Sequence, residues 1–140
     1  MLNHRRTRRG AATVEFALVA PIFFFTIIIP MIEFGRAMTV ASGIAATAQV
    51  GCRTGALYGK SNSDIQTAVD NNLAALGIKN ANPIVVKVKG GTANASTAAQ
   101  GDLVSVTVSV DYGNISWLPV SLCKYLGVTT LSSTQVMRRE

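Results

Sequence analysis

Residues 11–32 read AATVEFALVAPIFFFTIIIPMI and contain a single charged residue, Glu15. An α-helix rises about 1.5 Å per residue, so about 20 apolar residues cross the roughly 30 Å hydrocarbon core of a bilayer. We therefore expect this stretch to form one transmembrane helix. Two other interpretations stay open: a buried core helix, and a cleaved secretory signal, for which the run is long and no Ala-x-Ala site follows closely.

The excess of positive charge lies mainly at the two ends of the chain. The protein has 140 residues, of which 49% are hydrophobic and 14% charged, and its formal net charge is +6. Four arginines precede the apolar stretch, at positions 5, 6, 8 and 9, and they predict a cytoplasmic N-terminus with the remainder of the chain on the other side. Because no basic surface is interleaved with aromatic residues, we expect no nucleic-acid partner.

Three residues within the apolar stretch point to neighbouring helices. Pro21 and Pro30 each remove one backbone hydrogen bond, and in lipid the freed carbonyl groups need other donors. The carboxylate of Glu15 costs free energy in the membrane unless it lies near the interface or has a partner. A free α-amino group nearby would be a suitable cation. We therefore expect a helix that packs among other helices.

The sequence around Glu15 resembles a known processing site. Arg8-Arg9-Gly10 followed by Ala11-Ala-Thr-Val-Glu15-Phe16 is similar to the class III (type IVb, Flp-type) prepilin site. The run to Pro21, with IEFGR at 32–36, resembles the TadE-like pseudopilins of tight-adherence pili. The small residues at 48–56 are also similar to a later pattern of this family, except that Gln49 stands where a basic residue is often found. The resemblance covers about the first 57 residues well and the remainder in outline.

This resemblance implies a function. A prepilin peptidase would cut between Gly10 and Ala11, leaving Glu15 and Phe16 at the fifth and sixth mature positions. The chain would be a minor pilin or pseudopilin that assists assembly of tight-adherence pili. It would lie in the bacterial inner membrane as a single-pass protein, with its C-terminal domain extracytoplasmic. Its partners would be the peptidase, other pilin or pseudopilin subunits and the inner-membrane assembly platform; whether it enters the fibre stays open.

The processing site also has a physical interpretation. A glycine lets an extended backbone approach a peptidase closely. Cleavage would expose the amine of Ala11, with which Glu15 of an adjacent subunit could pair and so set the axial register. The alternative function is a single-pass membrane-anchored envelope protein with an extracytoplasmic binding domain. A membrane-anchored hydrolase is disfavoured because the mature chain would contain no histidine.

The whole pattern predicts an α+β, pilin-like protein with a long N-terminal transmembrane helix. We expect a basic leader at 1–10, the transmembrane helix at 11–32, a helical extension at 33–57 and an extracytoplasmic α+β domain at 58–140. In the extension, Gly51 and Gly55 have a spacing that allows close helix packing, although a loosely packed alanine-rich helix is equally compatible with it.

The outer domain is expected to hold one amphipathic helix and about three antiparallel strands. Ser63 and Gln66 form a candidate capping box, and Gly77 a helix stop. Apolar alternation predicts strands at 84–89 and 103–110, and composition a third at 128–137. Ser and Thr on one strand face predict a sheet packed on one side, covered by the 65–76 helix or the N-terminal one. We expect the linker at 90–102 to be mobile.

Little in the sequence indicates catalysis. His4, the only histidine, lies in the leader, and the four aspartates lack metal-ligand spacing. We therefore predict no enzyme activity, no cofactor and no metal site. Cys52 and Cys123 are too far apart for a CxxC motif, and outside the cytoplasm they could form a disulfide. Two independent buried thiols are the alternative.

Overall fold

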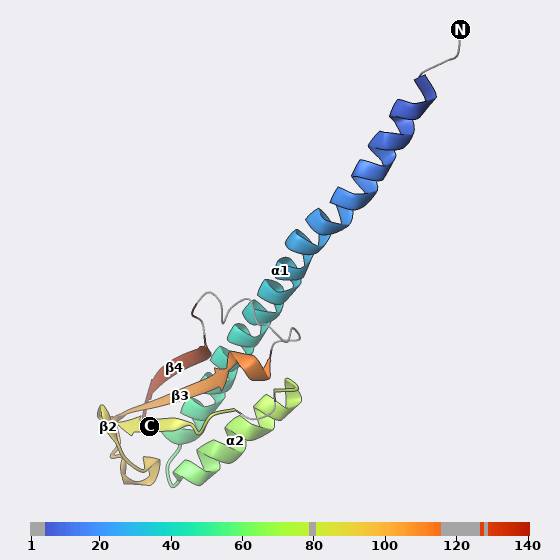
Figure 1. Ribbon diagram of the computed structural model, residues 1–140. Coiled ribbons are helices and arrows are strands. Elements are labelled where there is room, and N and C mark those ends of the chain that lie inside the picture. Colours follow the sequence, from blue (N-terminus) through green and yellow to red (C-terminus); the bar gives the residue numbers. More distant parts are fainter. Residues whose placement is uncertain (1–4, 79–80, 116–126, 128) are drawn as a thin grey trace. The chain divides into compact units, whose positions relative to one another are not determined.

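The computed structural model describes residues 5–78, 81–115, 127 and 129–140, with side chains from residue 10 onward (Figure 1). It contains a long helix, a shorter helix and a four-stranded antiparallel sheet, which confirms the α+β, pilin-like arrangement. The chain forms two compact units, residues 1–36 and 37–140. The elements are α1 (Arg5–Ala56), α2 (Asn62–Ala75), β1 (Val85–Val88), β2 (Gly91–Thr92), the 3-10 turns η1 (Ala95–Thr97) and η2 (Tyr112–Asn114), β3 (Leu103–Asp111) and β4 (Thr130–Arg138).

The sheet has the strand order β2-β1-β3-β4, so β2 and β4 are its edges. Alternation along β3 decides which face is buried. Its four valines, at positions 104, 106, 108 and 110, have no exposed surface, whereas the serines and threonine between them are partly exposed. Only one face of the sheet therefore packs against the core, as predicted.

Both helices cover that buried face. The core contains Ile44, Ala48 and Cys52 from α1 together with Ile65, Val69 and Leu73 from α2. Each of these six side chains has at most 2% of its surface exposed. The two candidate covers expected from the sequence thus act together, because residues 37–56 of α1 and the apolar stripe of α2 share one core with the valines of β3.

Gly51 and Gly55 let α1 approach its neighbours closely. A Cβ atom on Gly51 would lie 2.9 Å from Cγ2 of Val69 and 3.2 Å from Cγ1 of Val106. A Cβ atom on Gly55 would lie 2.9 Å from Cδ1 of Ile65. Distances near 3 Å are too short for two carbon atoms in contact, whose optimum is about 3.5–4.0 Å. The glycine spacing therefore has a packing role, and the interpretation as a loosely packed helix is wrong.

The start of α2 differs from the prediction by two residues. The N-cap is Ser61 rather than Ser63, and the acidic residue three positions later is Asp64. The carboxylate of Asp64 accepts hydrogen bonds from the backbone N–H of Ser61 at 2.9 Å and from its hydroxyl at 3.0 Å. Gln66, expected in the capping box, instead donates to Asp70 at 2.8 Å. The charged acceptor forms the stronger cap.

The linker at 90–102 contains two short regular elements, β2 and η1, and its mobility stays a prediction. Lys89 and Gly90 have φ angles of 52° and 82°, and Val88 pairs with Gly91 across them. Two consecutive positive φ angles are typical of the type I′ turn of a tight hairpin. This turn produces β2, a fourth strand that the sequence pattern did not reveal. The predicted third strand is present as β4.

Candidate processing and assembly site

The Gly10–Ala11 bond lies near the start of α1 and is exposed. A Cβ atom on Gly10 would meet nothing within 4 Å. A peptidase that binds extended backbone would reach this bond only after the first turns of the helix open. Glycine in a helix is about 1 kcal/mol less favourable than alanine, which lowers the cost of that opening. The position is therefore accessible, and its local sequence favours unwinding.

Glu15 lies four residues after Ala11, which places the two residues on the same face of the helix. Its side chain is exposed, and it forms no ion pair with any residue whose side chain the structure describes. An amine created at Ala11 would begin the helix, where the helix dipole favours a nearby negative charge. The neighbouring Phe16 is 73% exposed. The geometry thus leaves both side chains available for contacts with other molecules.

The helix that follows is apolar on every side. Large apolar side chains remain exposed through successive turns, from Val14 and Phe16 through Phe23, Phe24 and Phe25 to Met31 and Ile32. A helix that is hydrophobic all round is buried in a large core or spans a membrane. This is the one helix among the described residues that is long and apolar enough to cross a membrane, and a signal sequence would meet the same test.

Two prolines interrupt the backbone bonding of this helix, as the sequence predicts. Pro21 and Pro30 lie inside α1, which continues through both. Because proline has no N–H, the carbonyl groups four residues earlier, those of Ala17 and Thr26, lose their usual donors. The hydroxyl of Thr26 donates to the carbonyl of Ile22 at 2.7 Å and so does not satisfy either of them. These carbonyls can accept hydrogen bonds from a neighbouring helix.

Cys52 lies in the core of the second unit as a free thiol with no exposed surface. Its Sγ donates to the carbonyl oxygen of Gln135 at 2.9 Å and lies 3.7 Å from that of Val104. Cys123, its expected disulfide partner, lies outside the described residues. The disulfide therefore stays a prediction.

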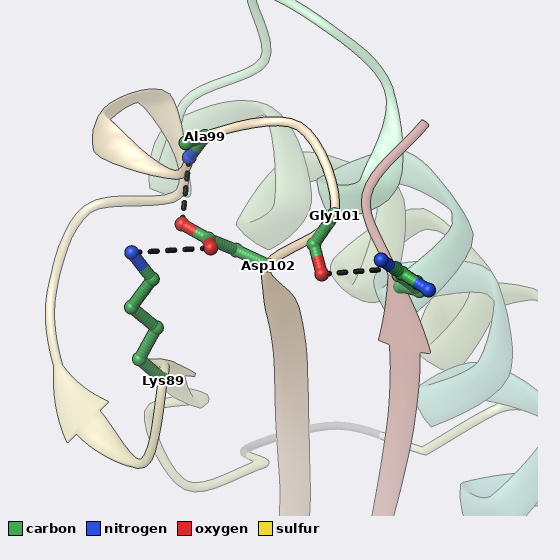
Figure 2. Close-up of polar contacts among 5 residues, drawn as sticks. Lys89, Ala99, Gly101 and Asp102 are labelled. Carbon is green, nitrogen blue, oxygen red and sulfur yellow. Dashed lines mark hydrogen bonds and ion pairs between the residues drawn. The ribbon is translucent and has the colours of Figure 1, made fainter.

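A polar cluster that the sequence did not suggest holds the end of the chain against the linker. Asp102 accepts a hydrogen bond from the N–H of Ala99 at 2.7 Å and pairs with Nζ of Lys89 at 3.1 Å, while Nε of Arg138 donates to the carbonyl of Gly101 (Figure 2). The Ala99 N–H, followed by Lys89, lowers the pKa of the Asp102 carboxyl from its usual value. These contacts connect the end of the linker to Lys89 and to the end of β4.

Arg139 continues this cluster into the core. Arg139 is 3% exposed. Its carbonyl accepts a hydrogen bond from the N–H of Gly101, and its own N–H donates to the carbonyl of Asp102. Its guanidinium donates to the carbonyl of Ala95 and lies over the ring of Tyr58. The sequence offered no signal for this burial, because a terminal arginine is usually solvated. Among the described residues, no group of three or more His, Cys, Asp or Glu side chains could hold a metal ion.

Comparison with known proteins supports the resemblance in the first part of the chain. The model of the family described as TadE-like protein matches residues 10–53. This range begins at Gly10, includes Glu15 and Phe16, and ends within the last turns of α1. No curated protein and no solved structure matches the chain.

Proposed function

Because residues 10–53 match the TadE-like family, we propose that this chain is a pilin-like protein of the tight-adherence pilus, made as a precursor and processed by a prepilin peptidase. Cleavage falls between Gly10 and Ala11, and the mature protein assists pilus assembly as a minor pilin or pseudopilin. The observation that carries the proposal is the exposed Gly10–Ala11 bond one helical turn before Glu15, at the start of an all-round apolar helix.

The charge distribution supports this role. The first ten residues contain four arginines and no acidic residue, so their removal takes the net charge from +6 to +2. The basic segment acts as a topological signal that keeps the N-terminus cytoplasmic, and it is then removed. The α+β unit at 37–140 is thereby extracytoplasmic, anchored by one helix in the inner membrane.

Glu15 has an assembly role in this proposal. In an apolar environment, a carboxylate and the new Ala11 amine of an adjacent subunit reduce each other's desolvation cost when they pair. The pair forms at one axial offset between two helices, so it sets their register. Phe16, which is exposed beside it, contacts the same neighbouring helix. The helix then inserts among other pilin-like subunits at the assembly platform, where further donors satisfy the carbonyls freed by Pro21 and Pro30. The match to a pilin-like family favours this non-enzymatic role.

N-terminal sequencing of the protein from cells that contain the peptidase tests the proposal. The wild-type protein should begin at Ala11. Gly10→Leu should retain the leader, because a side chain beside the scissile bond prevents close approach of the backbone to the peptidase. The control is Gly35→Ala, since Gly35 is also a helical glycine whose Cβ would meet nothing within 4 Å. Retention of Met1 in wild-type protein would favour an unprocessed envelope anchor.

A further inference from the structure

Strand β4 leaves one edge of its backbone unpaired. The carbonyl of Leu103 accepts from the N–H of Lys89 at 3.1 Å, and that of Ser109 accepts from Asn82 at 3.0 Å, so odd-numbered residues of β3 face β1. Even-numbered residues of β3 therefore face β4, where their register partners are Leu131, Ser133, Gln135 and Met137. The N–H and C=O groups of the intervening residues point away from the sheet: Thr130, Ser132, Thr134 and Val136.

This edge has little of the usual protection over residues 130–137. Within the part of the chain that the structure describes, no backbone group bonds these outward groups. Proteins commonly block edge strands with charged residues, proline or a bulge. β4 (TLSSTQVMR) has no proline and a single charged residue, Arg138 at its end, and its pairing with β3 runs without a break from residue 130 to residue 138. No described residue therefore prevents another strand from pairing with this edge between residues 130 and 137.

A hollow lies where the end of α1 meets this edge strand. It has a volume of about 380 Å³ and is lined by Arg53, Ala56, Leu57, Met137, Arg138 and Glu140. A second hollow of about 190 Å³ lies next to Arg53 and is also lined by Gln49 and Val50. The exposed Arg53 side chain is shared by both hollows and forms no ion pair among the described residues. The two hollows are lined by apolar side chains, two arginines and one glutamate, so their lining has a net positive charge.

We propose that the outer edge of β4 binds an extended segment of a partner protein. On one face of that segment, apolar and acidic residues follow each other at every second position. Side chains two positions apart lie on one face of a strand, so an apolar residue can enter the larger hollow while an acidic residue two positions away faces Arg53. Main-chain hydrogen bonds supply the affinity, and the hollow and Arg53 supply the selectivity.

The partner is a different protein rather than a second copy paired through β4. Residues 130–138 contain no acidic residue, so a second β4 has no carboxylate that could pair with Arg53. This inference does not depend on cleavage at Gly10, and its failure would leave the proposed processing untouched.

Peptide binding to the full chain in detergent micelles tests the charge selectivity. The probe is a fluorescein-labelled ten-residue peptide, Val-Ser-Glu-Ser-Val-Ser-Glu-Ser-Val-Ser, here called the Glu–Val peptide, which places Val and Glu on one face of a strand and Ser on the other. Its binding is followed by fluorescence anisotropy. The same peptide with Lys in place of each Glu should bind at least tenfold more weakly. Arg53→Gln should weaken binding of the Glu–Val peptide, and Glu140→Gln should strengthen it. Equal binding of the two peptides, or the same response to both variants, would overturn the proposal.

A pair of variants at Ser132 tests the strand pairing itself. Its N–H points outward, so Ser132→Pro removes one intermolecular donor without removing a bond to β3. We expect at least a tenfold loss of Glu–Val binding in Ser132→Pro and unchanged binding in Ser132→Ala. Equal affinities of these two variants would contradict edge pairing, as would a dimer of the wild-type chain in sedimentation that Ser132→Pro abolishes. If circular dichroism shows Ser132→Pro to be unfolded, the opposite effects expected of Arg53→Gln and Glu140→Gln on peptide binding decide whether the proposal holds.

Discussion

Substitution of Gly51 by alanine tests how closely α1 packs in the outer unit. The new Cβ atom would lie 2.9 Å from Val69 and 3.2 Å from Val106, and neither valine has exposed surface. Valine has one strongly preferred side-chain rotamer in a helix and few elsewhere, so neither methyl group can move away without strain. Overpacking of this kind costs about 1–3 kcal/mol, against about 1 kcal/mol gained when alanine replaces a helical glycine. We expect a net loss of about 0–2 kcal/mol.

The matched control is Gly43→Ala in the same helix. Its Cβ would lie 3.0 Å from Cδ1 of Leu76, which is the end of a flexible side chain that is 49% exposed and can move into solvent. This variant should therefore gain up to about 1 kcal/mol from helix propensity. Urea unfolding of the full chain in micelles, followed by circular dichroism, measures both. If Gly51→Ala is stabilised as much as Gly43→Ala, the close packing inferred here is wrong.

The remaining predictions concern charge and covalent structure. Glu15→Gln should impair pilus formation while membrane insertion stays intact, and Glu15→Asp should retain part of the function; normal piliation by Glu15→Gln in a strain that relies on this copy would refute the registry role. The pKa of the Asp102 carboxyl is lowered in the folded protein, so its stabilising contribution is complete above its unfolded pKa of about 4 and is lost as the pH falls through the folded value. Acid titration of the unfolding free energy should thus show a steeper loss in wild type than in Asp102→Asn. Arg139→Met removes the charged hydrogen bond to the Ala95 carbonyl, which keeps its bond from the N–H of Ala98, and should cost about 1–3 kcal/mol, more than the same change at the exposed Arg138, as measured by urea unfolding. Cys52 is a free thiol in the structure, so thiol labelling of the denatured, unreduced protein should label it; labelling of Cys52 only after reduction would instead support the disulfide with Cys123.

Local periodicity made much of the fold predictable. The uninterrupted apolar run forms one continuous helix through both prolines, and the alternating valines of 103–110 form a strand with one buried face. Such patterns repeat over many residues, so a single exception does not hide them. The start of α2 was harder because Ser61 and Ser63 each have an acceptor three residues later. Only the geometry distinguishes Asp64 from Gln66 as the capping partner.

Features that depend on contacts distant in sequence were not predictable. The need for glycine at position 51 comes from Val69 and Val106, whose positions against the helix no local pattern specifies. The burial of Arg139 likewise depends on Ala95 and Tyr58. The candidate processing residues are the opposite case, because Gly10, Ala11 and Glu15 form one short segment whose spacing is visible in the sequence. The structure adds that this segment is exposed.

The hydrogen bond from Cys52 to the carbonyl of Gln135 joins residues 83 positions apart, and this separation has a consequence for synthesis. The N-terminal part of a chain is made first, at about 5–20 residues per second. The face of α1 that carries Ile44, Ala48 and Cys52 therefore exists for several seconds before the strands that cover it have been made. During that interval the growing chain presents an apolar surface, so the yield of folded protein depends on how quickly its second half follows the first.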